Sequence, residues 1–93
     1  MDELPLNEIL RTCRAFGAGA VSVFGSRARG DAQPNSDLDL LVDFQRPVSL
    51  FDLIRLETEL ERLTGIPVDV VSVRAIKPSW REEILAEAKP IAA

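Results

Sequence analysis

Hydrophobic residues recur along the chain with two periods, and the longer period of three to four residues predicts helices. Apolar residues spaced by three and four predict an amphipathic helix over residues 4–16, ended by Gly17. The same spacing predicts a helix between Ser49 and Gly65, where Asp52 follows Ser49 at capping-box distance. Its apolar stripe consists of Leu50, Leu53, Leu56, Leu60 and Leu63. We expect this stripe to face a core and the charged residues between its members to face solvent.

A last helix is predicted to begin at Pro78 and to stop before Pro90. Ser79 and Glu82 have capping-box spacing at its start. Trp80 lies in its first turn, and we interpret it as a core or edge anchor, with a role in an interface as the alternative.

The shorter period of two residues, together with continuous apolar runs, predicts strands over residues 19–24, 37–44 and 67–73. The chain is therefore predicted to be an α/β (α+β) protein in the order α-β-α-β-α-β-α, with helices packed on a mixed sheet of three or slightly more strands. Ninety-three residues predict a single domain over 1–93. The crossover helix between the second and third strands favours a parallel pair, whereas we expect the first two strands to be antiparallel.

The turn after the first strand has the composition of an anion site. Gly25 permits unusual backbone angles, and Ser26 is suited to the N-cap or first turn of a short helix that Gly30 ends. N–H groups at a helix start lack partners within the helix and favour a phosphate. Gly25 and Ser26 are therefore predicted to bind one.

Three aspartates are predicted to meet beside this turn. A period of two places Asp37 and Asp39 on one face of the second strand, opposite Leu38 and Leu40. A parallel third strand would bring Asp69 next to them, although Asp69 by itself could equally be a strand-end cap. Adjacent carboxylates repel, and Mg²⁺ removes that repulsion because it prefers oxygen ligands.

Composition narrows the classes of function. Eleven basic and fifteen acidic residues give a net charge of −4, which argues against direct nucleic-acid binding. The absence of histidine excludes imidazole catalysis and histidine-ligated zinc. Cys13, the single cysteine, falls on an apolar helix face and is predicted to be a core residue. No apolar run is long enough for a membrane span and the start is acidic, so we expect a cytoplasmic protein.

The segments Gly25-Ser26-Arg27-Ala28-Arg29-Gly30 and Ser36-Asp37-Leu38-Asp39-Leu40 together resemble the signature of polymerase-beta-type nucleotidyltransferases. They are most similar to the minimal branch, the MntA-like antitoxins of HEPN toxin-antitoxin modules, and the resemblance covers nearly the whole chain. It implies that Gly25 and Ser26 hold the phosphates of ATP. It also implies that Asp37, Asp39 and Asp69 bind two Mg²⁺ ions and are the catalytic residues.

The resemblance further implies transfer of AMP to a hydroxyl, such as a tyrosine, of a HEPN-domain toxin. The alternatives are a non-catalytic antitoxin that masks the toxin by binding it, and a small-molecule transferase. A complex with the toxin or a homo-oligomer is expected. Arg27 could contact the triphosphate or lie in solvent, and the same choice applies to Arg29 and Lys77.

Overall fold

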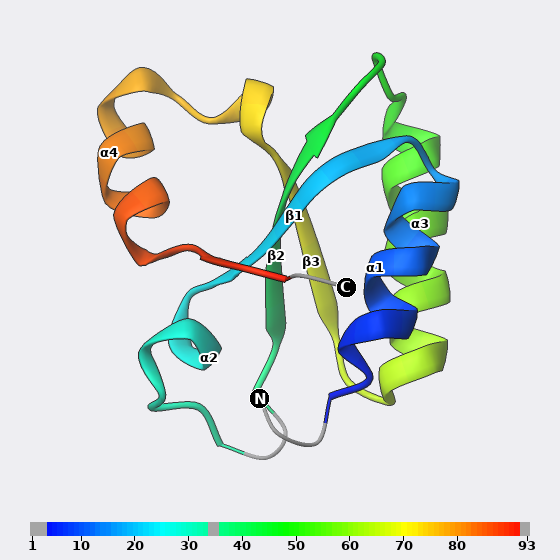
Figure 1. Cartoon of the computed structure of the whole chain (residues 1–93), viewed down its shortest axis with the longest axis horizontal. Coiled ribbons are helices and arrows are strands. Elements are labelled where there is room, and N and C mark those ends of the chain that lie inside the picture. The colour runs from blue at the N-terminus through cyan, green and yellow to red at the C-terminus, as the bar shows by residue number, and fades with distance from the viewer. Residues whose placement is uncertain (1–3, 34–35, 92–93) are drawn as a thin grey trace.

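The computed structural model describes residues 4–33 and 36–91, which form a mixed four-stranded sheet with helices on both sides (Figure 1). In chain order the elements are α1 (Leu6–Ala15), β1 (Ala18–Phe24), α2 (Ser26–Arg29), β2 (Leu38–Phe44), α3 (Leu50–Thr64), β3 (Val68–Ser72), the 3-10 turn η1 (Val73–Ala75), α4 (Pro78–Glu87) and β4 (Lys89–Pro90). The predicted fold class and the predicted order of helices and strands are confirmed.

The strand order is β3-β2-β1-β4. As predicted, β1 and β2 are antiparallel and β2 and β3 are parallel. The sequence did not predict β4, which pairs antiparallel with β1 at the sheet edge. Pro90 lies in this edge strand and does not end a helix directly, since α4 already ends at Glu87. A proline is tolerated at an edge because its missing N–H removes no bond from the ladder.

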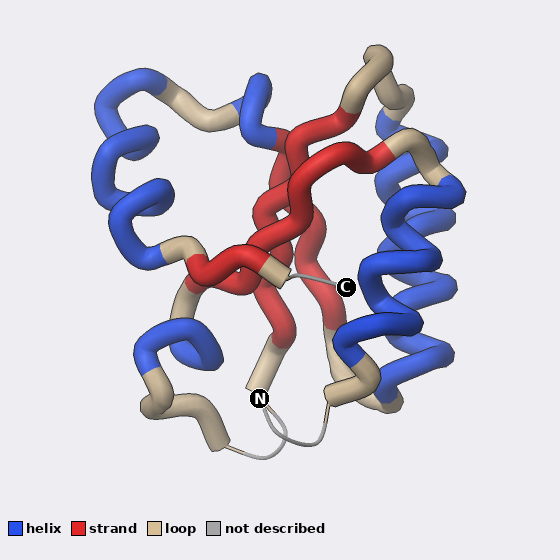
Figure 2. Tube along the Cα trace, viewed as in Figure 1, coloured by secondary structure: helices blue, strands red, loops and turns tan. Residues whose placement is uncertain are grey.

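The core lies between the sheet and the pair formed by α1 and α3, whereas α2 and α4 lie on the other side of the strands (Figures 1 and 2). Leu38, Leu40 and Val42 of β2 are fully buried in it, as their alternation with aspartates predicts. Cys13 is also fully buried, as predicted, and burial raises the pKa of its thiol to about 12.

The predicted apolar stripe of α3 is only partly buried. Leu56 and Leu60 are in the core, but Leu50 is 71% exposed and Leu63 is 37% exposed, so the stripe was wrong at both ends. Leu50 and Leu63 lie in the first and last turns of α3, on either side of the central Leu56 and Leu60 that reach the core. In the described parts of the chain, no helix combines the length and apolar character needed to cross a bilayer.

The start of α4 differs from the prediction. Lys77 is the N-cap, Pro78 occupies the first turn and no side chain caps the helix, so the expected Ser79–Glu82 capping box is absent. Proline suits the first turn because it has no N–H to satisfy there. Trp80 is 56% exposed, so its prediction as a core anchor was wrong.

The charged face of α3 does more than face solvent. The N–H groups of Val68 and Val70 in edge strand β3 donate to Glu61 Oε2 at 3.0 Å and to Glu57 Oε2 at 2.8 Å. These N–H groups lie on the outer side of β3, which is an edge strand of the sheet formed by the described residues. The two glutamates thus complete hydrogen bonding at an edge that would otherwise offer a template for another strand.

We expect Glu57→Ala to lower the free energy of unfolding by about 1–3 kcal/mol, because the half-buried Val70 N–H loses a charged acceptor. Glu59→Ala is the matched control, since within the described residues Glu59 pairs with exposed Arg62 on the same helix and should change stability by less than about 0.5 kcal/mol. Urea unfolding of both variants measures the difference. Equal effects would mean that the edge bond to Glu57 contributes nothing specific.

Candidate active site

Asp39 stands at the centre of the predicted site because β2 lies between two partner strands. It is aligned with Phe24 of antiparallel β1 and with Asp69 of parallel β3. Residues aligned across neighbouring strands point to the same face, so the two carboxylates share a face. Leu38 and Leu40 occupy the opposite face and hold it against the core. The structure therefore brings Asp39 and Asp69 together, as the parallel pairing predicted.

Gly25 directly follows the last residue of β1 and lies against the side chain of Asp39. Its φ of 74° and ψ of −153° lie in a region that only glycine adopts readily. A Cβ at Gly25 would also collide with Asp39 Oδ2. Glycine is thus required here for two independent reasons, its backbone angles and the close approach of the carboxylate.

Ser26 begins α2 as its first residue, with Gly25 as the N-cap, so its predicted place in the first turn is confirmed. The N–H groups of Ala28 and Arg29 donate to Gly25 O, and these are the first hydrogen bonds of the helix. The N–H of Ser26 comes before them and therefore has no acceptor within the helix. Gly30 ends the turn in the left-handed conformation. Because α2 has only four residues, its dipole is small, and an anion here would depend on the Ser26 hydroxyl and the nearby N–H groups.

The acidic residues act on one another. Partial burial raises the pKa of Asp39 above its ordinary value, and the charges of Asp69 and Asp37 raise it further, while Arg29 opposes the shift. Asp37 precedes β2 and is exposed, and Asp69 is exposed as well. Asp39 is therefore the carboxylate on which burial and negative charge converge.

These carboxylates suit a hard divalent cation. Within residues 4–33 and 36–91, no three acidic, histidine or cysteine side chains are gathered closely enough to form a ready-made metal cage. Mg²⁺ does not need one, because it usually takes one or two carboxylates and completes its shell with phosphates and water. The Asp39–Asp69 pair beside the Gly25 turn matches that chemistry.

Two arginines of α2 have partners that the sequence did not reveal. Arg27 Nε and Nη2 donate to the backbone oxygen of Ser36 at 3.2 and 2.8 Å. Arg29 pairs with Asp31 at 3.4 Å and with Glu87 of α4 at 3.1 Å. The Glu87 contact is 58 residues distant in sequence, so no local pattern could have indicated it. Lys77 is the exposed N-cap of α4.

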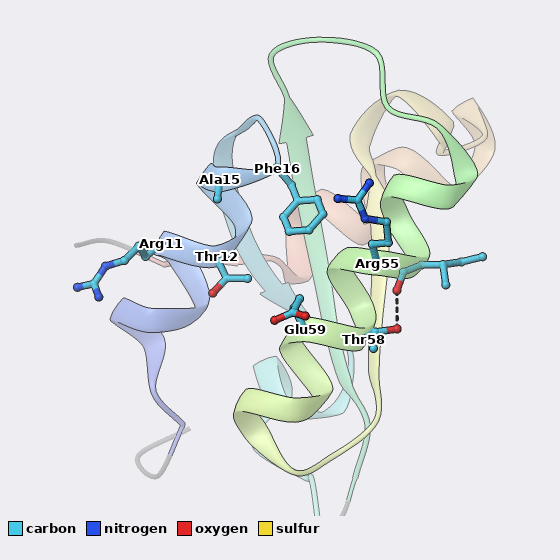
Figure 3. A pocket seen from close by; sticks show the side chains of 8 residues that line it. Arg11, Thr12, Ala15, Phe16, Arg55, Thr58 and Glu59 are labelled. Atoms are coloured by element: carbon cyan, nitrogen blue, oxygen red, sulfur yellow. Dashed lines mark hydrogen bonds between the residues drawn. The ribbon is translucent and has the colours of Figure 1, made fainter.

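A separate hollow of about 610 Å³ lies between α1 and α3 (Figure 3). The Arg55 guanidinium stacks over the Phe16 ring there, 5.8 Å from its centre. The lining residues are Arg11, Thr12, Ala15, Phe16, Ile54, Arg55, Thr58 and Glu59. None of the predicted site residues contributes to it, so this hollow is distinct from the aspartate site.

We expect Asp39→Asn to unfold at a higher urea concentration than the native chain at pH 7. Because the folded pKa of Asp39 lies above its unfolded value of 3.8, the folded state binds more protons between the two values, and stability falls as pH rises through that window. The advantage of the variant should shrink as pH falls toward 4. Asp43→Asn, at the exposed far end of β2, is the control, and an Asp39→Asn variant no more stable than the native chain at pH 7 would contradict the repulsion.

Gly25→Ala should lower stability by about 1–3 kcal/mol, because alanine is strained at this backbone conformation. The resemblance implies that this turn binds a nucleotide with Mg²⁺, and Gly25→Ala should then weaken that binding at least about tenfold, because the Cβ displaces the Asp39 carboxylate. Gly65→Ala is matched to it, since Gly65 has a φ of 75° and open space around a Cβ. The control should lose about 1–2 kcal/mol of stability and retain nucleotide binding, whereas equal binding by both variants would refute the role of the Gly25 contact.

The known proteins that this chain resembles in sequence and in structure point to the same family. Residues 6–91 match the family described as nucleotidyltransferase domain. The chain is 43% identical over 72 residues to the protein adenylyltransferase MntA of Thermococcus cleftensis, an alignment that covers 77% of this chain and 73% of the relative.

Solved structures share the fold. One, of a proposed minimal nucleotidyltransferase, is 48% identical with a TM-score of 0.81, covering 91% of this chain and 87% of that one. A toxin-antitoxin complex with AMP-PNP has 22% identity and a TM-score of 0.86, covering 97% of this chain and 74% of that one. A complex of tri-AMPylated HEPN toxin with MNT antitoxin from Shewanella oneidensis has 19% identity and a TM-score of 0.78, covering 100% and 73%. The family match together with the two close relatives shows that this chain belongs to the nucleotidyltransferase domain family, in its minimal branch.

Proposed function

We propose that this protein is a Mg²⁺-dependent adenylyltransferase that moves AMP from ATP to a hydroxyl, a tyrosine in particular, of a cognate HEPN toxin, with release of pyrophosphate, and thereby acts as its antitoxin. The observation that carries the proposal is the Asp39–Asp69 pair aligned across β2 and β3, with Asp39 packed against Gly25. A phosphate turn and a carboxylate pair in contact are what nucleotidyl transfer requires.

Each residue of the site receives a role in the proposal. Gly25 and Ser26 hold the β- and γ-phosphates, and Arg27, in the same turn, belongs to the nucleotide site. Asp37, Asp39 and Asp69 hold Mg²⁺, two ions in all, which would neutralise charge on the α-phosphate. Asp69 is exposed and accepts the proton of the acceptor hydroxyl, directly or through water.

The acceptor is proposed to be a protein because of the family context. The similar protein from Thermococcus cleftensis is named a protein adenylyltransferase, and a fold neighbour from Shewanella oneidensis is in complex with an AMPylated HEPN toxin. We propose that residues 1–93 act as one such domain in complex with its toxin. A cytoplasmic setting would supply the ATP.

The test is intact-mass spectrometry of the HEPN toxin encoded beside this protein, after incubation with the native chain, ATP and Mg²⁺. We expect the toxin to gain mass in units of AMP, and we expect the Asp39→Asn variant, whose folding urea unfolding would verify, to add none. Digestion and fragmentation of the product would locate AMP on tyrosine. A stable complex that suppresses the toxin without any added mass would overturn the proposal in favour of an antitoxin that masks its partner.

A further inference from the structure

The guanidinium of Arg27 is committed to a backbone oxygen of the loop that leads into β2. Its Nε and Nη2 both donate to Ser36 O, at 3.2 and 2.8 Å, across nine residues of sequence. The contact is partly buried, which strengthens a charge-assisted bond relative to one in open water. Arg27 therefore ties the first turn of α2 to the residue immediately before Asp37.

The N–H and the hydroxyl group of Ser36 are also held by hydrogen bonds. Its N–H donates to Gln33 O at 3.0 Å, and its hydroxyl accepts the N–H of Gln33 at 2.8 Å. One residue after Asp37, the Leu38 N–H donates to Pro67 O at 2.9 Å as β2 meets the approach to β3. Asp37 thus sits between two anchored neighbours, Ser36 on the α2 side and Leu38 on the β3 side.

We propose that Arg27 is a positioning residue that sets the distance between the Gly25–Ser26 turn and the Asp37 carboxylate by holding Ser36 O. The inference deepens the proposed function and rests on it for the roles of the turn and of Asp37. Asp37 is exposed and lies outside the β2 ladder, so its backbone has less support from the sheet than that of Asp39. The bond from Arg27 to Ser36 supplies that support.

The forked geometry requires arginine. Two N–H groups of one planar guanidinium converge on a single oxygen, and the ammonium of lysine cannot reproduce this arrangement although it has the same charge. A charge that merely attracted phosphate would tolerate lysine. Arg29 provides the internal comparison, because it lies on the same short helix but pairs with Asp31 and Glu87.

The test compares the native chain with Arg27→Lys, Arg27→Gln and the charge-loss control Arg29→Gln. Amide exchange of Ser36, Asp37 and Leu38 is measured by NMR without nucleotide or metal. We expect exchange at Ser36 to quicken about tenfold in both Arg27 variants and to remain native-like in the control. Urea unfolding identifies any variant that fails to fold. If Arg27→Gln does not fold, the comparison is made with Arg27→Lys alone.

The second readout is a titration with Mn²⁺, as a paramagnetic substitute for Mg²⁺, in the presence of AMP-PNP. Both Arg27 variants should bind Mn²⁺ about 10-fold more weakly, the usual effect of losing a residue that orients a metal ligand. Native exchange and native Mn²⁺ affinity in Arg27→Lys, or equal losses in Arg29→Gln, would overturn the proposal. If the native chain fails to modify the toxin while both readouts follow expectation, the proposed function fails and the positioning role of Arg27 stands.

Discussion

The position of Asp39 in the central strand constrains everything else in this site. Antiparallel β1 delivers Gly25 to one side of it, and parallel β3 delivers Asp69 to the other. A shift of β3 by one residue would turn Asp69 toward the leucines of the core, where an unpaired charge is costly, and a shift of β1 would move Gly25 away from Asp39. The apolar face of β2 therefore fixes the register, and the register assembles the site from three separate stretches of chain.

The same arrangement costs stability. Asp39 is partly buried and close to two other negative charges, which is why its pKa is raised. A sequence selected only for stability would not place Asp39 and Asp69 side by side, or require Gly25 to leave space for an oxygen. The local cost is offset by the core between the sheet, α1 and α3, where Leu38 and Leu40 are fully buried directly behind the carboxylates.

Helix α3 serves both the core and the sheet edge. Leu56 and Leu60 face inward, while Glu57 and Glu61 accept the outward N–H groups of β3, the strand that carries Asp69. The edge that bears one of the site carboxylates is thus closed by side chains of the helix that precedes it. Leu50 and Phe51 in the first turn of α3 are 71% and 78% exposed, and no element of the described chain covers them.

The sequence by itself determined the local features: the hydrophobic periods that mark helices and strands, the Ser49–Asp52 capping box, the Gly25–Ser26 turn and the alternation that sets Asp39 between the buried Leu38 and Leu40. Strand β2 begins at Leu38, so Asp37 lies just before it and the predicted shared face of Asp37 and Asp39 stays a prediction. The sequence also predicted that β3 brings in Asp69, because a helical crossover favours parallel strands. Only the tertiary structure decided features that depend on distant partners. Pairing with β1 made a strand of Lys89–Pro90, the packing of α3 buried Leu56 and Leu60 but left Leu50 and Leu63 exposed, and the approach of α3 to β3 gave Glu57 and Glu61 their bonds. The partners of Arg27 and Arg29 were also decided by the tertiary structure. A long arginine side chain can reach many acceptors, and the sequence does not show which of them the fold brings close.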